Sequence, residues 1–275
     1  MAQQQDKDHW DSGNYQHSAS FVPKLAGKVT QWLDLQKDDV VLDIGCGDGI
    51  LNLEFAKVLS QGKGSIHGID SSASMIEAAT KLCKDFPNAT FEVLDGTKIA
   101  TNSALQAGTF TKAFSNAAMH WILNCPESAR AGYFTSVHAA LALGGTFAFE
   151  MGGLGNVSEM RTALIMAASR RIGMAAAQAA DPWFFPDEAW ATAALEAAGF
   201  RVDKVEREWR PTKADKGGVE GWVRLFGSHV IDAVPEAQRD DVVREVAETL
   251  RFVCADGSGG EMISYVRLRA LATKI

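Results

Sequence analysis

Short apolar runs alternate with segments of helical periodicity along the first half of the chain. The runs have the length and the β-branched content of buried strands. They are VVLDIG, SIHGID, TFEVLD, KAFSNA and GTFAFEM, all between residues 40 and 151. Helices are expected at residues 22–33, 50–59, 72–84 and 128–143. This alternation predicts a parallel sheet covered by helices, a doubly wound Rossmann-like α/β fold.

The rhythm changes after Met151, where two helical blocks interrupt the strands and helices. The segment PDEAWATAALEAAGF predicts a further core helix ending at a glycine, followed by the strand RVDKVEREW, and EMISYVRLRAL predicts the last strand. We expect a mobile N-terminal arm or lid, a cofactor-binding core completed by two later segments, and two helical insertions that form a cap over one sheet edge. The arm is residues 1–21. The core is residues 22–153, 183–211 and 258–275, and the two insertions are residues 154–182 and 212–257.

Composition and charge exclude several classes of protein. The 275 residues carry a net charge of −7 and a pI near 5.4, which argue against a nucleic-acid backbone as the main partner. The N-terminus is polar and no apolar run approaches the ~18 residues of a membrane span, so we expect a cytoplasmic protein. The four cysteines are scattered and predict reduced thiols and no metal site. The oligomeric state stays open.

A glycine turn follows the first predicted strand, with the sequence GCGDG at residues 45–49. A phosphate-binding G-x-G-x-x-G turn would need a third glycine where Ile50 stands. The carboxylates of Asp43 and Asp48 flank the turn, where they would repel a pyrophosphate but suit a cationic amine or sulfonium. The turn therefore favours a ligand with positive charge and an adenosine, S-adenosylmethionine, over NAD.

Two further acids end the next two predicted strands. Asp70 stands where a carboxylate in such folds accepts hydrogen bonds from both ribose hydroxyls. Asp95 is placed to accept from the adenine amino group, with the backbone N–H of Gly96 or Thr97 meeting the ring. A single acid is better explained as a helix cap or a solvated loop carboxylate, so the prediction rests on acids at the ends of three successive strands. Ser74, with Glu77 three residues later, is typical of a capping box.

The motifs VLDIGCGDG, GIDSSASMIEAA, FEVLDG, FSNAAMHWI and LGGTFAFE follow one another in an order that resembles the class I S-adenosylmethionine-dependent methyltransferases. The resemblance covers residues 40–150 and implies a seven-stranded sheet whose last strand is antiparallel. SNAAMHWI, the capped sheet and PDEAWATAALEAAGF resemble more narrowly the trans-aconitate methyltransferase group of small-molecule enzymes.

The resemblance also implies which residues hold the cofactor. Asp43, Gly45 and Gly47 would line the methionine end, and the main chain of Asn116 would meet the methionine amine. The full implied set is Asp43, Gly45, Cys46, Gly47, Asp70, Ser71, Met75, Asp95, Gly96, Thr97, Asn116 and Ala117.

The acceptor side is less determined by the sequence. His120, just past the fourth predicted strand, is expected to face the methyl group, where it would take a proton from a hydroxyl, hydrogen-bond an acid, or simply fix the loop. Tyr15 and His17 on the arm are further candidate catalytic residues that could close the site. Candidate substrate-binding residues are Trp121, Met151 and Trp222. Either Arg210 or Arg224 could pair with a substrate carboxylate, unless both are solvated at the surface.

These observations predict an S-adenosylmethionine-dependent methyltransferase that acts on a small molecule by in-line transfer. Oxygen of a carboxylate or hydroxyl is the expected acceptor, and sulfur, nitrogen and halide acceptors stay open. Two alternatives remain at this point. One is a protein of this fold that binds the cofactor without methyl transfer, as a scaffold or a pericyclic catalyst. The other is an NAD-dependent oxidoreductase.

Overall fold

The computed structural model describes residues 26–215 and 217–275, and a seven-stranded sheet runs through this part of the chain. Its strands are β1 (Val40–Ile44), β2 (Ser65–Asp70), β3 (Ala89–Val93), β4 (Phe110–Asn116), β5 (Leu141–Gly152), β6 (Phe200–Lys213) and β7 (Met262–Lys274). The spatial order is β3-β2-β1-β4-β5-β7-β6. β1 to β5 pair in parallel, whereas β7 is antiparallel to both of its neighbours, β5 and β6. The predicted doubly wound fold is confirmed.

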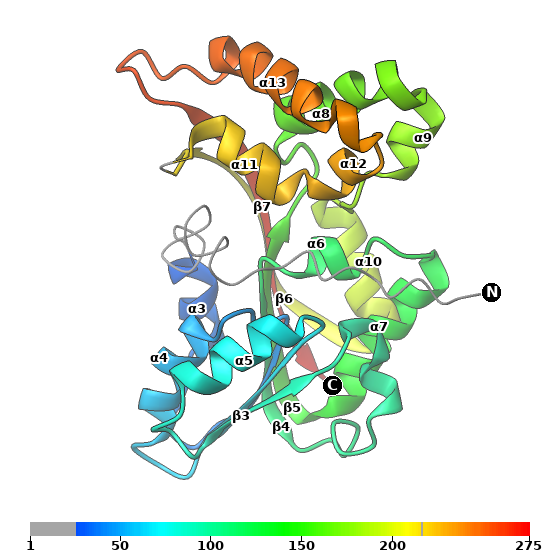
Figure 1. Cartoon of the computed structure of the whole chain (residues 1–275). Helices are drawn as coiled ribbons and strands as arrows, with labels where there is room; N and C mark the ends of the chain where they lie inside the picture. The colour runs from blue at the N-terminus through cyan, green and yellow to red at the C-terminus, as the bar shows by residue number, and fades with distance from the viewer. Residues whose placement is uncertain (1–25, 216) are drawn as a thin grey trace, which may run out of the picture.

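Helices cover both faces of the sheet because its strands are apolar on both sides. Along β1, Val41 packs with the cluster that contains Val29 and Phe55, whereas Leu42 and Ile44 pack with the cluster on the opposite face. The first face carries α3 (Gly27–Leu33), α4 (Ile50–Leu59) and α5 (Ala73–Leu82). The second carries α7 (Glu127–Ala140) and α10 (Glu188–Ala197), as Figure 1 shows, and the 3₁₀ helix η1 (Gly96–Thr101), which packs against α7.

Five further helices form a cap beyond the end of the sheet at which β1 and β4 finish (Figure 1). They are α8 (Ser158–Ile172), α9 (Met174–Ala179), α11 (Gly218–Phe226), α12 (Ser228–Asp232) and α13 (Glu236–Val253). The cap has its own apolar core, in which Leu164 of α8 packs with Val223 of α11 and Val246 of α13. β6 runs to Lys213, past the expected start of the second block at residue 212, because its pairing with β7 continues to the Lys213–Met262 pair.

The helix cap expected at Ser74 is wrong. α5 begins one residue after Ser72, and the Ser72 hydroxyl accepts a hydrogen bond from the Met75 amide at 3.3 Å. Ser74 therefore lies inside the first turn. Both serines precede the same apolar face, so the motif by itself did not decide between them.

None of the described helices is long and apolar enough to cross a membrane.

Candidate active site

The glycine turn lies where the strand order reverses, between β1 and β4. Gly45, Gly47 and Gly49 have φ of +76°, +57° and +80°, which side chains rarely adopt. A Cβ on Gly45 would lie 2.2 Å from the Cβ of Ala118, and one on Gly49 would lie 2.7 Å from the Cβ of Ala79. A Cβ on Gly47 would meet nothing within 4 Å. The outer two glycines therefore serve close packing, and the middle one exposes its backbone to open space.

Asp70 fixes the shape of this turn. Its Oδ2 accepts a hydrogen bond from the Gly47 amide at 3.0 Å, and its Oδ1 accepts one from the Ser72 amide at 2.9 Å. The carboxylate thus holds the turn to the end of β2. A carboxylate oxygen can accept more than one hydrogen bond, so these two contacts do not by themselves prevent Asp70 from accepting from a ligand hydroxyl.

The Asp43 carboxyl lies beneath the same turn and is only 2% exposed. Burial, with a smaller contribution from the nearby Asp70 charge, raises the pKa of Asp43 to about 7. Burial and the charges of Asp43 and Asp70 also hold the pKa of the Cys46 thiol well above its ordinary value. Cys46 is therefore a neutral thiol. The negative charges of Asp43 and Asp70 suit the site to a cation.

The ends of β3 and β4 complete this part of the site. The Oδ1 of Asp95 accepts hydrogen bonds from the amide and the hydroxyl of Thr97, both at 2.8 Å, and thereby caps η1. The Oδ1 of Asn116 is buried without a hydrogen-bond partner among the described residues. Ala117, next along the chain, has φ of +58°. An unpaired buried oxygen, the open side of Gly47 and acidic strand ends fit an adenosine-bearing cation with an amine.

Two other predicted cofactor residues lie at the start of α5. Ser71 is exposed, whereas the Met75 side chain is buried. Gly96 is buried against Ile122 of α6 (Met119–Ile122), where a Cβ would come within 3.0 Å of the isoleucine side chain. These residues gather around the carboxyl ends of β1, β2 and β3, as the sequence predicts, and their roles in binding stay predictions.

A cavity of about 50 Å³ lies between this edge of the sheet and the cap. Aromatic side chains form much of its wall: Trp121, Trp183, Phe185, Trp222, Phe226 and Tyr265. Its polar groups come from His120, Glu150, Asn156, Arg210 and Arg267. Ala117 also lines it and follows Asn116, so the cavity adjoins the expected position of the cofactor.

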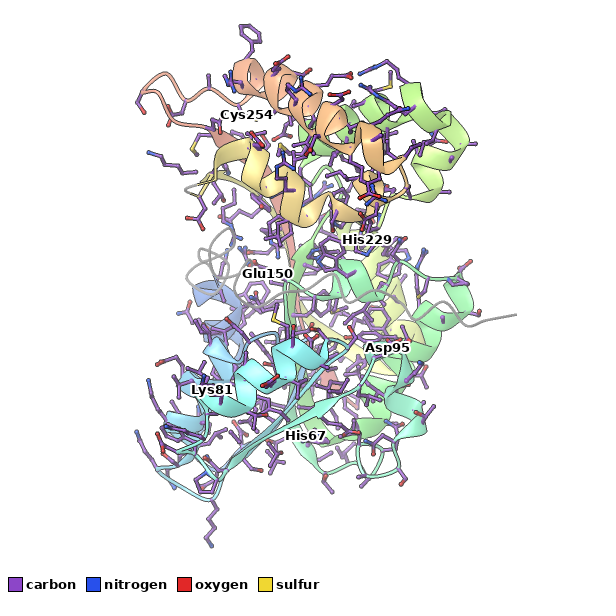
Figure 2. All side chains as sticks on the ribbon, viewed as in Figure 1. His67, Lys81, Asp95, Glu150, His229 and Cys254 are labelled. Carbon is purple, nitrogen blue, oxygen red and sulfur yellow. The ribbon has the colours of Figure 1, made fainter. Side chains whose placement is uncertain are left out.

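A buried charge cluster forms one side of the cavity. Glu150 is 2% exposed and accepts hydrogen bonds from the Nε atoms of Arg267 at 3.0 Å and Arg269 at 2.5 Å. Arg210 lies 3.3 Å from the same carboxylate, and these three guanidiniums outweigh burial and hold the pKa of Glu150 below its ordinary value. Figure 2 shows Glu150 at the junction of the sheet with the cap. Glu206 and Glu208, which do not line the cavity, both pair with Arg269, and Glu206 also pairs with Lys28.

His120 lies in α6 and is 7% exposed. Its Nδ1 accepts a hydrogen bond from the Gly152 amide at 3.3 Å, and its ring lies 5.7 Å from that of Phe185 between centroids. Burial, and then the charge of Arg267, hold the pKa of His120 well below its ordinary value. The ring is therefore neutral at physiological pH.

The remaining predicted residues separate into two groups. Trp121 and Trp222 line the cavity, but Met151 is fully buried in the core on the other face of β5, because neighbouring side chains on a strand point to opposite faces. Arg224 is exposed on the cap and pairs with Glu220 and Asp240, so it does not reach the cavity. Tyr15 and His17 lie outside the described residues.

The sequence reasoning missed Glu150, Arg267 and Tyr265. A signal was present, because Glu150 ends an apolar strand and the last strand carries arginines at alternate positions, 267 and 269. Charged residues on one face of a buried strand need partners there. No group of three or more His, Cys, Asp or Glu suited to a metal ion occurs within 26–215 and 217–275.

Comparison with known proteins agrees with this geometry. A family model described as a methyltransferase domain matches residues 35–179, more than half of the chain. An uncharacterized methyltransferase of Schizosaccharomyces pombe is 37% identical over 271 residues, which cover 98% of this chain and 99% of that protein. The chain belongs to the methyltransferase family. It is a class I enzyme with S-adenosylmethionine as its cofactor, as the glycine turn and its acids predicted.

Partial matches and solved structures extend the comparison. The trans-aconitate 2-methyltransferase of Pseudomonas paraeruginosa is 34% identical over 27% of this chain and 26% of that one. An 18S rRNA (guanine-N7) methyltransferase of Saccharomyces cerevisiae is 30% identical over 45% of this chain and 44% of that one. The YcgJ protein of Bacillus subtilis shares the fold, with a TM-score of 0.58 at 13% identity over 90% of this chain and 97% of that one.

Proposed function

We propose that this methyltransferase transfers the methyl group of S-adenosylmethionine to an oxygen of a small carboxylic acid. The observation that carries the proposal is the cavity beside the cofactor position, where Arg210 and Arg267 stand with one buried acid between them. Glu150 also pairs with Arg269, so it does not balance both cavity arginines. Two arginines and one acid line the cavity, so its charged side chains carry net positive charge, which favours an anionic acceptor.

The chain's own residues would position the acceptor and exclude water. When bound, S-adenosylmethionine supplies a methyl group already activated by its sulfonium. Arg210 and Arg267 would hold the acid in line with the sulfur–carbon bond, which fixes the geometry of attack. Trp121, Trp183 and Trp222 would exclude water and contact the apolar body of the acid. An oxygen–carbon bond forms as the sulfur–carbon bond breaks, and S-adenosylhomocysteine leaves.

We infer a small molecule in preference to RNA, although one partial relative is an rRNA enzyme. The net charge of −7 opposes a phosphate backbone, and the cavity of about 50 Å³ lies under the cap instead of along an open basic face. Family membership sets aside the oxidoreductase alternative. A cofactor-binding protein without methyl transfer is separated from a transferase by measuring turnover. The cytoplasmic location expected from the sequence stays a prediction.

Screening acceptors tests the proposal directly. Purified protein with S-adenosylmethionine is incubated with mono- and dicarboxylic acids, alcohols, phenols, amines, thiols and RNA, and S-adenosylhomocysteine release and product mass are recorded. We expect methyl esters of one group of acids. Arg210→Gln should raise the acceptor KM at least tenfold, whereas Arg224→Gln, a matched change at an exposed arginine, should not. Release with RNA or neutral acceptors alone would contradict the proposal.

A further inference from the structure

One ring nitrogen of His120 accepts a hydrogen bond from the backbone. The Gly152 amide donates to its Nδ1 at 3.3 Å. A ring nitrogen that accepts a hydrogen bond carries no proton, and a neutral imidazole has only one N–H. The proton of the neutral His120 ring therefore resides on Nε2. For Nε2 the described residues offer no hydrogen-bond partner, and His120 lines the cavity.

The surroundings hold the ring in this orientation. Phe185 and Trp121 contact it, with ring centroids 5.7 Å and 5.5 Å away. A Cβ on Gly152 would lie 2.4 Å from the Phe185 ring, so a glycine is needed for this packing. The His120 carbonyl also accepts from the Phe184 amide at 2.9 Å, which ties α6 to the segment before α10.

The charged and titratable groups around the ring favour the same state. Arg267 and Tyr265 of β7, Arg210 of β6 and Glu150 of β5 line the same cavity as the ring. From the cap, His229 packs against Trp121, 5.8 Å away between ring centroids. Arg267 opposes a second proton on the ring. Glu150 is engaged by guanidiniums and does not offset this effect.

We propose that His120 is a fixed hydrogen-bond donor to the acceptor through its Nε2–H, and that methyl transfer in this enzyme uses no general base. The proposal rests on the proposed function, because it requires an acceptor that enters as an oxyanion. His120 donates to one carboxylate oxygen and leaves the other oxygen to attack the methyl group. No proton has to be removed, since the carboxylate is ionised before it binds. A neutral hydroxyl acceptor would require a base, which this tautomer cannot supply from Nε2.

Spectroscopy tests the tautomer without any acceptor. Imidazole ¹⁵N shifts of the protein bound to S-adenosylhomocysteine should show His120 with a bare Nδ1 and a protonated Nε2 at pH 7. A His120→Gln spectrum assigns the signal. A proton on Nδ1, or a doubly protonated ring at pH 7, would overturn the proposal whatever the acceptor is.

Kinetics test the role, at saturating S-adenosylmethionine and with an acid found by the screen. We expect acceptor kcat/KM to vary less than threefold between pH 6 and 9. His120→Ala should lower kcat/KM roughly 30-fold, mainly through KM, which is the loss expected for one hydrogen bond to a charged group. His120→Gln keeps a donor near the Nε2 position. It should therefore recover at least a third of the decrease in log(kcat/KM) that His120→Ala causes.

A general base would give different results. The wild-type profile would then fall tenfold per pH unit on its acid side, and His120→Gln would be as inactive as His120→Ala through kcat. His67→Gln on β2, remote from the cavity, is the matched control and should leave all parameters unchanged. Binding of S-adenosylhomocysteine within threefold of wild type shows that each variant is folded. If the screen finds only neutral acceptors, the proposed function fails, whereas the ¹⁵N result still decides the tautomer.

Discussion

Asp70 has two tasks at the scale of a single residue. Its oxygens accept the Gly47 and Ser72 amides, and the sequence predicts that they also accept the ribose hydroxyls. A carboxylate is suited to both tasks because each oxygen can accept two hydrogen bonds. Removing the carboxylate should therefore release the glycine turn and also weaken binding of the ligand.

We expect Asp70→Ala to weaken S-adenosylmethionine binding at least 100-fold, since hydrogen bonds to a charged group contribute roughly 1.5–3 kcal/mol each. Asp70→Asn retains one acceptor oxygen and should lose less. Calorimetric titration gives the dissociation constants, and circular dichroism checks that the sheet is intact. An unchanged Kd in a folded Asp70→Ala protein would remove Asp70 from the cofactor site.

Asp43 gives a pH-dependent prediction. Its pKa is raised by burial to about 7 in the folded protein. The contribution of Asp43 to the free energy of unfolding is therefore full below its unfolded value of 3.8, and it is lost as the pH rises from 3.8 through 7. That shift corresponds to roughly 4 kcal/mol in the free energy of unfolding. The ionised form that remains above pH 7 is the form that attracts a cation.

S-Adenosylmethionine affinity should therefore increase about tenfold between pH 6 and pH 8, following the ionised fraction of Asp43. Asp43→Asn should bind more weakly at pH 8 and lose most of this dependence. Its unliganded form should be more stable than wild type at pH 8, as measured by urea unfolding. Equal pH dependence in the two proteins would show that another group titrates.

At the scale of elements, a buried side-chain hydrogen bond is among the contacts that link the cap to the sheet. The Trp222 indole Nε1–H of α11 donates to the Tyr265 hydroxyl of β7 at 2.5 Å, and both side chains are buried. Burial raises the pKa of Tyr265, so the hydroxyl stays neutral across the physiological range. This contact positions one wall of the cavity.

Tyr265→Phe leaves the buried indole N–H of Trp222 without its acceptor, which should cost about 1–3 kcal/mol in the free energy of unfolding. Tyr133→Phe is the matched control, because the buried Tyr133 hydroxyl lies near Ser115 but makes no hydrogen bond of ordinary geometry among the described residues, and the Ser115 hydroxyl donates to the Ile44 carbonyl instead. Urea unfolding should show the loss for the first variant and little or none for the second. Equal effects would mean that the Trp222–Tyr265 bond adds no stability.

At the scale of the whole molecule, the arm from residue 1 to about 20 holds the candidates Tyr15 and His17, which lie outside the described residues. A terminus that closes over the bound pair would exclude water and open for product release.

Deletion of residues 1–20 should leave the melting temperature and cofactor affinity nearly unchanged while lowering turnover at least tenfold, about 1.4 kcal/mol in the barrier. Steady-state kinetics of the truncated protein with the screened acceptor is the measurement. Full activity would assign water exclusion to the cap alone. Tyr15→Phe and His17→Ala should each reproduce part of the loss if these side chains contact the acceptor.

The sequence by itself determined the sheet, the glycine turn and the acids at the strand ends, because periodicity, turn chemistry and strand-end position are local properties. It did not decide which residues face the acceptor. Met151 and Glu150 are neighbours in sequence, yet the pleat sends one to the core and the other to the cavity.

Only the tertiary structure brought Glu150 of β5 to Arg210 of β6 and Arg267 of β7, because the strand order β5-β7-β6 does not follow the order in the chain. It likewise placed the Gly152 amide against His120, 32 residues earlier, which is the contact on which the proposed tautomer rests. Both outcomes depend on ion pairs or hydrogen bonds between distant segments, which local patterns do not encode.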